Sequence, residues 1–170
     1  GLSSYSPEGN EIAYNRISRE HRTWKRYKGG MAQDIWIYNF DKNDTRRVTD
    51  WIGSDNFPMW QGGSIYYTSD QTGRLQIWAY DTNAKTHRQI TKHDEYDVKS
   101  PSLGPDAIVY ENGGWLYVLD LKTEKTRKVS VSLRSDNVLT RATVKKVGAR
   151  VRGGDLAPDA NRAVFGARGD

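Results

Sequence analysis

Short apolar runs alternate with polar turns along this chain, and the runs return at a near-constant interval. Three runs that begin with an aromatic residue align with one another, at residues 36–39, 78–81 and 117–120. Their first residues are 42 and 39 positions apart, and 13 positions after each of them stands a hydroxyl residue: Thr49, Thr91 and Ser130. Runs of this length that are rich in Val, Ile, Trp and Tyr predict β-strands joined by turns.

A second set of β-type runs accompanies the first, and every one of them follows a turn sequence. These runs lie at residues 12–14, 65–67, 108–110 and 163–165. The turn at residues 6–9, Ser-Pro-Glu-Gly, has Ser, Pro and Gly at the positions that a type I turn prefers. Gly or Pro residues stand at the matching places before the other three runs, at residues 62–63, 104–106 and 157–159. The recurrence indicates one structural unit that is repeated.

A repeat of about 40 residues with four short strands is typical of a β-propeller blade. We therefore predict an all-β fold made of β-propeller blades of four antiparallel strands, with about three blades plus part of a fourth. The predicted domain is one partial propeller over residues 1–170, with blade repeats at approximately 1–49, 57–91, 99–130 and, in part, 154–170. The alternative is a β-sandwich whose similar hairpins are accidental.

The composition agrees with a folded domain. The length of 170 residues fits one domain, and an aromatic content of 11% argues against disorder. The absence of cysteine excludes a disulfide framework and a thiolate metal site. No apolar run approaches the ~18 residues of a membrane span, so we expect no membrane association. The chain begins at Gly1 rather than Met, and we expect it to be part of a longer protein.

The positive charge is concentrated in two segments. The formal net charge is +5, but residues 16–28 hold six Lys or Arg against one Glu, and residues 127–152 hold eight against one Asp. The first segment lies in a long insertion between the second and third strands of the first repeat. Its candidate binding residues are Arg16, Arg19, Arg22, Trp24, Lys25, Arg26, Tyr27 and Lys28.

Three interpretations of this insertion stay open. Basic residues with interleaved aromatics can bind phosphates by charge and bases by stacking. Arginine forks can equally bind the carboxylates of a peptide, in which case replacing both Arg22 and Lys25 by Ala would weaken the entry of acidic peptides. The insertion can also be a solvated loop that folds over the blade edge, with Trp24 and Tyr27 packing it down.

Two aspartates form a second candidate site. Asp55 and Asp97 each follow a closing threonine by six residues and lead into a proline. Both are expected where the innermost strand of a new blade begins, near the central channel. Beside the basic insertion they could hold one end of a peptide, or each could order its own loop by bonding to nearby backbone.

The chain shows no sequence signature of catalysis. His21, His87 and His93 are not at the spacing of a metal site, and no Gly-x-Ser-x-Gly motif or identifiable pair of catalytic carboxylates occurs. We therefore expect no catalytic residue, no metal and no cofactor in this segment.

Specific strings resemble known propellers. Residues 6–14 resemble the Ser-Pro-Asp-Gly blade motif of TolB-like propellers, with Glu8 in place of the usual Asp and, in the last copy, Ala160 in place of the usual Gly. More specific strings are similar to the amino-terminal six-bladed propeller of tricorn proteases, at residues 14–17, 23–30, 33–36, 55–60, 108–114 and 167–170. The likeness covers nearly the whole chain and is weakest over residues 131–152.

The resemblance implies a large, self-compartmentalising serine peptidase that trims oligopeptides. In that family two propellers gate the passage of peptides, a PDZ domain follows, and the catalytic residues lie far downstream, outside these 170 positions. The expected function is a non-catalytic propeller segment of such a peptidase that acts as peptide gate and scaffold. The alternative is a TolB-like protein-binding propeller of an envelope complex without peptidase activity; a nucleic-acid binder is the least favoured interpretation.

The expected partners follow from the same interpretation. They are peptides or a protein partner, together with the remaining blades and domains of the parent chain. Three blades and part of a fourth cannot close a ring of six, so the segment is also expected to self-associate through its open faces. The resemblance implies a cytoplasmic location, with the periplasm as the alternative.

Overall fold

The chain folds into successive strand meanders, which the computed structural model describes at residues 2–18, 25–134 and 136–167. It divides into two compact units, Gly1–Val131 and Ser132–Asp170, each described here by itself. The first unit contains β1 (Ser3–Tyr5), β2 (Glu11–Asn15), β3 (Ile35–Asn39), β4 (Asp44–Arg47), β5 (Asp55–Gln61), β6 (Ser64–Ser69), β7 (Gln76–Asp81), β8 (Thr86–Gln89), β9 (Val98–Leu103), β10 (Ala107–Asn112), β11 (Trp115–Asp120) and β12 (Thr126–Lys128). Every run that the sequence predicts as a strand lies within a strand.

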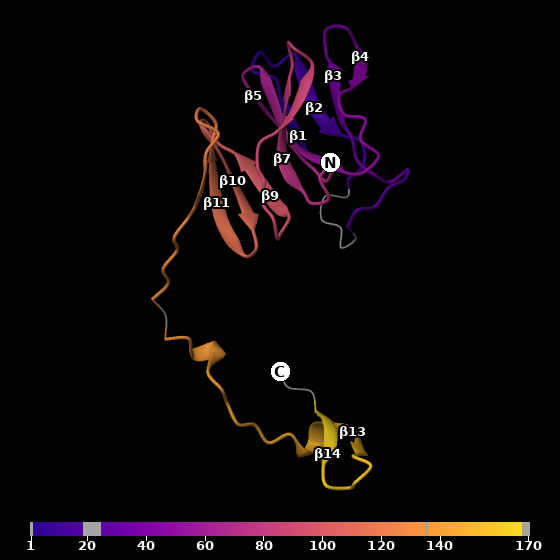
Figure 1. Ribbon diagram of the computed structural model, residues 1–170, viewed down its shortest axis with the longest axis vertical. Coiled ribbons are helices and arrows are strands. Elements are labelled where there is room, and N and C mark those ends of the chain that lie inside the picture. Colours follow the sequence, from indigo (N-terminus) through magenta and orange to yellow (C-terminus); the bar gives the residue numbers. More distant parts are fainter. Residues whose placement is uncertain (1, 19–24, 135, 168–170) are drawn as a thin grey trace. The chain divides into compact units, whose positions relative to one another are not determined.

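Three antiparallel sheets of four strands make up the first unit (Figure 1). Their orders are β1-β2-β3-β4, β5-β6-β7-β8 and β9-β10-β11-β12, so each strand pairs with its neighbours in sequence. This meander is the blade arrangement, and the prediction of β-propeller blades is confirmed. The β-sandwich alternative is wrong, because its Greek-key connections would pair strands that are distant in sequence.

The first and second sheets bury an apolar layer between them. Ala13, Ile35 and Ile37 of the first sheet pack with side chains of the second, which are Trp60, Ile65, Tyr67 and Tyr80. Alternation along each strand sends these residues to one face and their neighbours to the other. Each large apolar side chain buried in this way contributes about 1.5–3 kcal/mol.

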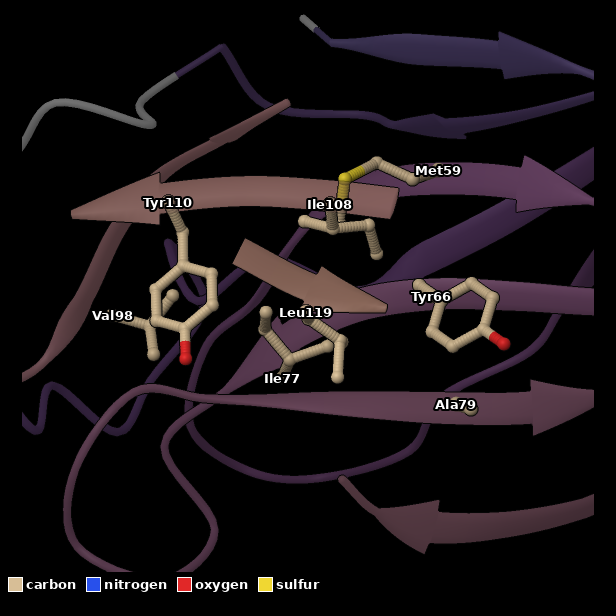
Figure 2. Close-up of a cluster of buried hydrophobic side chains, with 8 residues drawn as sticks. All are labelled: Met59, Tyr66, Ile77, Ala79, Val98, Ile108, Tyr110 and Leu119. Carbon is tan, nitrogen blue, oxygen red and sulfur yellow. The ribbon is translucent and has the colours of Figure 1, made fainter. Parts of the chain in front are cut away.

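The second and third sheets repeat the same packing with the next set of residues. Figure 2 shows side chains of the two sheets gathered in one cluster, with Met59, Tyr66, Ile77 and Ala79 from the second and Val98, Ile108, Tyr110 and Leu119 from the third. Tyr66 and Ile77 thus use the face of the second sheet opposite to Ile65 and Tyr67. The second sheet is therefore covered on both faces, as an inner blade must be.

Closing threonines complete the first two sheets. The Oγ1 atom of Thr49 accepts a hydrogen bond of 2.9 Å from the backbone N–H of Ile35, and that of Thr91 accepts one of 2.8 Å from Ile77. Both threonines are buried and lie just beyond β4 and β8, rather than within a strand. In the first two repeats the hydroxyl residue 13 positions after the aromatic thus has a physical cause, because it satisfies a backbone N–H at the start of the third strand; Ser130 of the third repeat is exposed.

The second unit is a single hairpin preceded by two 3-10 turns. It contains η1 (Val138–Thr140), η2 (Gly148–Arg150), β13 (Val151–Leu156) and β14 (Ala163–Ala167). The two strands pair antiparallel, with a register shift between Arg152 and Gly154. Across the described parts of the chain, no helix has the length and apolar character that a membrane crossing requires.

Candidate peptide-binding loop face

Five connections emerge on the same side of the first unit because antiparallel strands alternate in direction. They join the second strand to the third within a sheet, or the fourth strand to the first strand of the next sheet. We call this side the loop face; its connections are residues 16–34, 48–54, 70–75, 90–97 and 113–114. The first is the longest, as the sequence predicts. Of its candidate residues, Arg19, Arg22 and Trp24 lie outside the described part of the chain.

Two of the predicted cations lie over tryptophan rings. The guanidinium carbon of Arg16 is 4.8 Å from the ring centroid of Trp36, and Lys28 Nζ is 5.4 Å from that of Trp51. Such contacts are worth about 0.5–1 kcal/mol at exposed sites. They fasten both ends of the β2–β3 connection to the first sheet and to the β4–β5 connection.

Arg26 and Tyr27 have structural contacts in the middle of the connection. Arg26 has a φ of 55° and donates a hydrogen bond of 3.0 Å from Nε to the carbonyl oxygen of Gly73 in the β6–β7 connection. A Cβ atom at Gly29 would lie 2.7 Å from the Tyr27 hydroxyl oxygen, so the half-buried Tyr27 ring lies against the backbone of its own connection.

Lys25 and Asp97 form an ion pair across the loop face. The Nζ atom of Lys25 is 2.6 Å from Asp97 Oδ2, while Asp97 Oδ1 accepts a hydrogen bond of 3.2 Å from the backbone N–H of Leu75. The two partners are 72 positions apart in sequence. The pair joins the β2–β3 connection to the β8–β9 connection, so the structure brings together two residues that the sequence places in separate candidate sites.

Asp55 has a different environment, in the protein interior. It is the first residue of β5 and has no solvent-exposed surface. Burial raises the pKa of its carboxyl group to about 7. The hydroxyls of Ser69 and Thr49 favour the ionised form in part, but neither oxygen of the carboxyl group has a hydrogen bond of good geometry with a described residue. Burial therefore dominates.

Asp55 and Asp97 are not equivalent positions, although their spacing from the closing threonines is equal. The backbone N–H of Asp55 donates a hydrogen bond of 2.8 Å to the carbonyl oxygen of Gln33, in the preceding repeat. The corresponding bond one repeat later, to the carbonyl oxygen of Leu75, is also 2.8 Å long but comes from Val98 rather than from Asp97. The positive φ angles of the inner strands, at Phe57 and Ser100, show the same spacing of 43. Asp97 therefore lies one position earlier, outside β9, where its buried carboxylate meets Lys25.

The sequence does not single out Trp51 and Asp70, which also shape the loop face. Trp51 Nε1 donates a hydrogen bond of 2.7 Å to Asp70 Oδ1, and the same oxygen accepts one of 3.0 Å from the backbone N–H of Ser54. A Cβ atom at Gly53 would overlap both Trp51 Nε1 and that carboxyl oxygen. The sequence feature that could have pointed to Trp51 is a tryptophan followed two residues later by a glycine in a connection between blades.

The two described histidines are held by tyrosines. His87 Nδ1 lies 2.9 Å from the Tyr67 hydroxyl oxygen, and His93 Nε2 lies 2.9 Å from that of Tyr110. Burial lowers the pKa of each ring. Among the residues that the structure describes, no three His, Asp or Glu side chains gather as a metal-binding group.

Comparison with known proteins places this geometry in a family. The model of the tricorn protease N-terminal beta propeller domain matches residues 1–125. The chain belongs to this family. A tricorn protease homolog of Saccharolobus solfataricus is 26% identical over 135 residues, which is 79% of this chain and 13% of that protein. Tricorn protease homolog 1 of Streptomyces coelicolor is 29% identical over 69% of this chain and 11% of that protein.

Solved structures agree with the family at the level of the fold. The crystal structure of the tricorn protease superposes with a TM-score of 0.69 and 26% identity, over 79% of this chain and 13% of that one. The putative TolB from Agrobacterium tumefaciens superposes with a TM-score of 0.59 and 21% identity, over 73% of this chain and 46% of that one. The chain spans only about an eighth of its tricorn relatives, and the TolB likeness shows the propeller fold alone.

Proposed function

We propose that this chain is a non-catalytic propeller segment of a tricorn-like serine peptidase that degrades oligopeptides, and that it acts as peptide gate and scaffold. The observation that carries the proposal is the family match over residues 1–125. The chain covers only 11–13% of the tricorn relatives, and the proposal assigns the peptide chemistry to other parts of the parent protein.

The gate is assigned to the β2–β3 connection. Its described residues contact three other connections of the loop face, through Lys28 with Trp51, Arg26 with Gly73, and Lys25 with Asp97. A connection held at these three points reaches across the loop face from the first sheet to the connections that lead into the second and third sheets. Loops held on a rigid sheet scaffold are where propellers place binding functions.

The scaffold role is assigned to the sheets. Both interfaces between successive sheets are closed by large apolar side chains, which hold the loop face in one arrangement. Such preorganisation is what a binding surface needs to avoid the entropic cost of ordering.

The gate is tested in the parent peptidase that the proposal implies. Replacing Arg26 and Lys28 together by Ala removes two of the three contacts that the β2–β3 connection makes with other connections. We expect kcat/KM to change by roughly threefold to tenfold for a peptide of about ten residues and to stay constant for a short chromogenic substrate. Equal effects on both substrates, or none on either, would contradict the gate.

The control for this experiment removes the same charge at the opposite side of the sheets. Lys42 and Lys122 lie in exposed turns between third and fourth strands. Their joint replacement by Ala should leave both substrates unaffected. The isolated 170-residue chain should itself release no product from the ten-residue peptide.

The second candidate function is a TolB-like protein-binding propeller in an envelope complex. The structural likeness to TolB favours it at the level of the fold. The sequence that follows this segment in its gene separates the two candidates. A PDZ domain with downstream catalytic serine and histidine supports the peptidase, and a chain that ends with the last blade supports the TolB-like protein.

A further inference from the structure

The ion pair between Lys25 and Asp97 joins two very unequal partners. The Asp97 side chain is only 9% exposed, while that of Lys25 is 67% exposed. One carboxyl oxygen of Asp97 accepts a hydrogen bond from the backbone N–H of Leu75, and the other faces the lysine ammonium group. The carboxylate is therefore a built part of the loop face, and the lysine reaches it from the solvent side.

We propose that Asp97 is a binding site for the cationic group of a peptide, either its terminal ammonium or a basic side chain, and that Lys25 occupies this site until the peptide replaces it. The inference rests on the proposed function, since it names the class of peptide that the loop face accepts. Displacement of Lys25 removes one of the fastenings of the β2–β3 connection. Peptide binding and release of the connection are then the same event.

The burial of the two partners decides the charge of the ligand. When a cation replaces Lys25, Asp97 keeps an ion pair and the exposed lysine returns to water, where it is well solvated. When an anion binds Lys25 instead, Asp97 is left buried without a counter-charge, which is strongly unfavourable. The exchange thus favours a cationic peptide group and disfavours an acidic one, the opposite of the charge that the basic composition of the insertion suggests.

The surroundings of Asp97 support the same sign. Asp94 and Glu95 are exposed in the same β8–β9 connection, and together with Asp97 they outnumber Lys92. Clustered charge of one sign raises the local concentration of ligands of the other. Two cations lie nearby on the loop face, and both are bonded to backbone carbonyl oxygens: Arg74 Nε donates to Glu95 at 3.2 Å and Arg26 Nε donates to Gly73 at 3.0 Å.

The remaining fastenings explain how the connection survives the exchange. Arg26 bonds to Gly73 and Lys28 lies over Trp51, and neither contact involves Asp97. Loss of the Lys25 contact therefore loosens one point of the connection and leaves the adjacent ones in place. The expected change is local, at the β8–β9 connection and at Leu75.

The test uses three forms of one probe peptide with the 170-residue chain. The forms are Ala-Ala-Ala amide with a free amino terminus, the N-acetylated peptide and the N-succinylated peptide, which are cationic, neutral and anionic. Affinity is measured by NMR titration, with the backbone amide of Leu75 as the reporter because it bonds to Asp97. We expect the free-amine form to bind and shift this amide, and the other two forms to leave it unchanged.

Variants separate this site from other peptide contacts. Lys25→Ala removes the competing ammonium and should tighten binding of the free-amine peptide by about threefold to tenfold. Asp97→Asn should weaken it by at least about tenfold. Lys122→Ala, the same charge change in the β11–β12 turn, should have no effect. Weaker binding by Lys25→Ala, which alters an exposed residue and leaves the core intact, overturns the proposal even if Asp97→Asn fails to fold.

The outcomes distinguish this inference from the proposed function. If all three peptide forms bind equally, or the succinylated form binds best, the assignment to Asp97 is overturned while a peptide-binding loop face stands. If no form binds and the substrate-length experiment on the parent peptidase shows no gate, both are overturned.

Discussion

Asp55 carries a carboxyl group that the fold removes completely from water. Its pKa is raised from 3.8 to about 7 by burial. Between these values the folded chain binds a proton that the unfolded chain has lost, so the stability contribution of this group falls as pH rises from about 4 to about 7. A difference of this size corresponds to at most about 4 kcal/mol.

We predict that Asp55→Asn raises the stability of the chain, relative to the parent, more at pH 8 than at pH 5, because Asn has no charge to bury. The readout is the difference in Tm between variant and parent, which should be several degrees larger at pH 8. Using this difference cancels the opposite contribution of His87 and His93, whose lowered pKa values destabilise the fold as pH falls. A difference in Tm that is the same at both pH values would show that Asp55 is ionised in the fold.

Residue identity alone places Asp55 and Asp97 at the same step of the repeat, but the structure separates them by one position. One residue of offset decides whether a side chain lies inside the strand or in the connection before it. Both carboxyl groups are buried, but that of Asp55 has no hydrogen-bond partner among the described residues, whereas that of Asp97 is paired with Lys25. Their chemical difference could not be predicted from spacing because the repeats are 42 residues apart before the inner strand and 43 within it.

Among the elements, the third strands of the first two sheets each depend on one hydroxyl group from beyond the fourth strand. Thr91 Oγ1 accepts from the Ile77 N–H and donates to Gln76 Oε1 at 2.8 Å. Both partners are buried. Removing the hydroxyl leaves a backbone donor without an acceptor in a place that water does not reach.

We predict that Thr91→Val lowers the free energy of unfolding by about 1–3 kcal/mol, since the valine keeps the shape but not the acceptor. Urea denaturation measures this free energy of unfolding. Thr86→Val is the matched control, because Thr86 is exposed on β8 and the change should fall within about 0.5 kcal/mol. If both variants lose the same stability, the closing threonine acts through packing or strand propensity rather than through its hydrogen bond.

At the scale of the whole molecule, the third sheet of the first unit presents an apolar face. Val109 and Leu116 are 42% and 46% exposed, although their counterparts in the second sheet, Tyr66 and Ile77, are buried against the third. The first sheet presents the complementary face at the other end. Its residues there are Ile12, Tyr14, Trp36 and Tyr38, the counterparts of buried or partly buried residues of the second sheet.

We predict that the 170-residue chain self-associates at micromolar concentration, because the two faces of one copy match those that already pack within the chain. Static light scattering should report a mass above 19.4 kDa. Val109→Lys together with Leu116→Lys should shift the mass toward the monomer. Ala84→Lys with Thr86→Lys, at exposed positions of the β7–β8 hairpin in the inner second sheet, should not. A parent chain that is monomeric throughout this range would contradict the prediction.

The blades could be predicted from the sequence: their strands, their order, their closing threonines and their membership of the tricorn propeller family. These features are encoded locally, in apolar alternation and in turn residues, and they recur often enough to be recognised. The contacts of the charged residues, in contrast, follow from the packing of the sheets. Lys25 and Asp97 meet because successive sheets place distant loops side by side, and Asp55 is shielded because a neighbouring sheet covers it. The behaviour of a charged side chain depends on its partners and on its exposure to water, and the spacing of residues within one strand predicts neither.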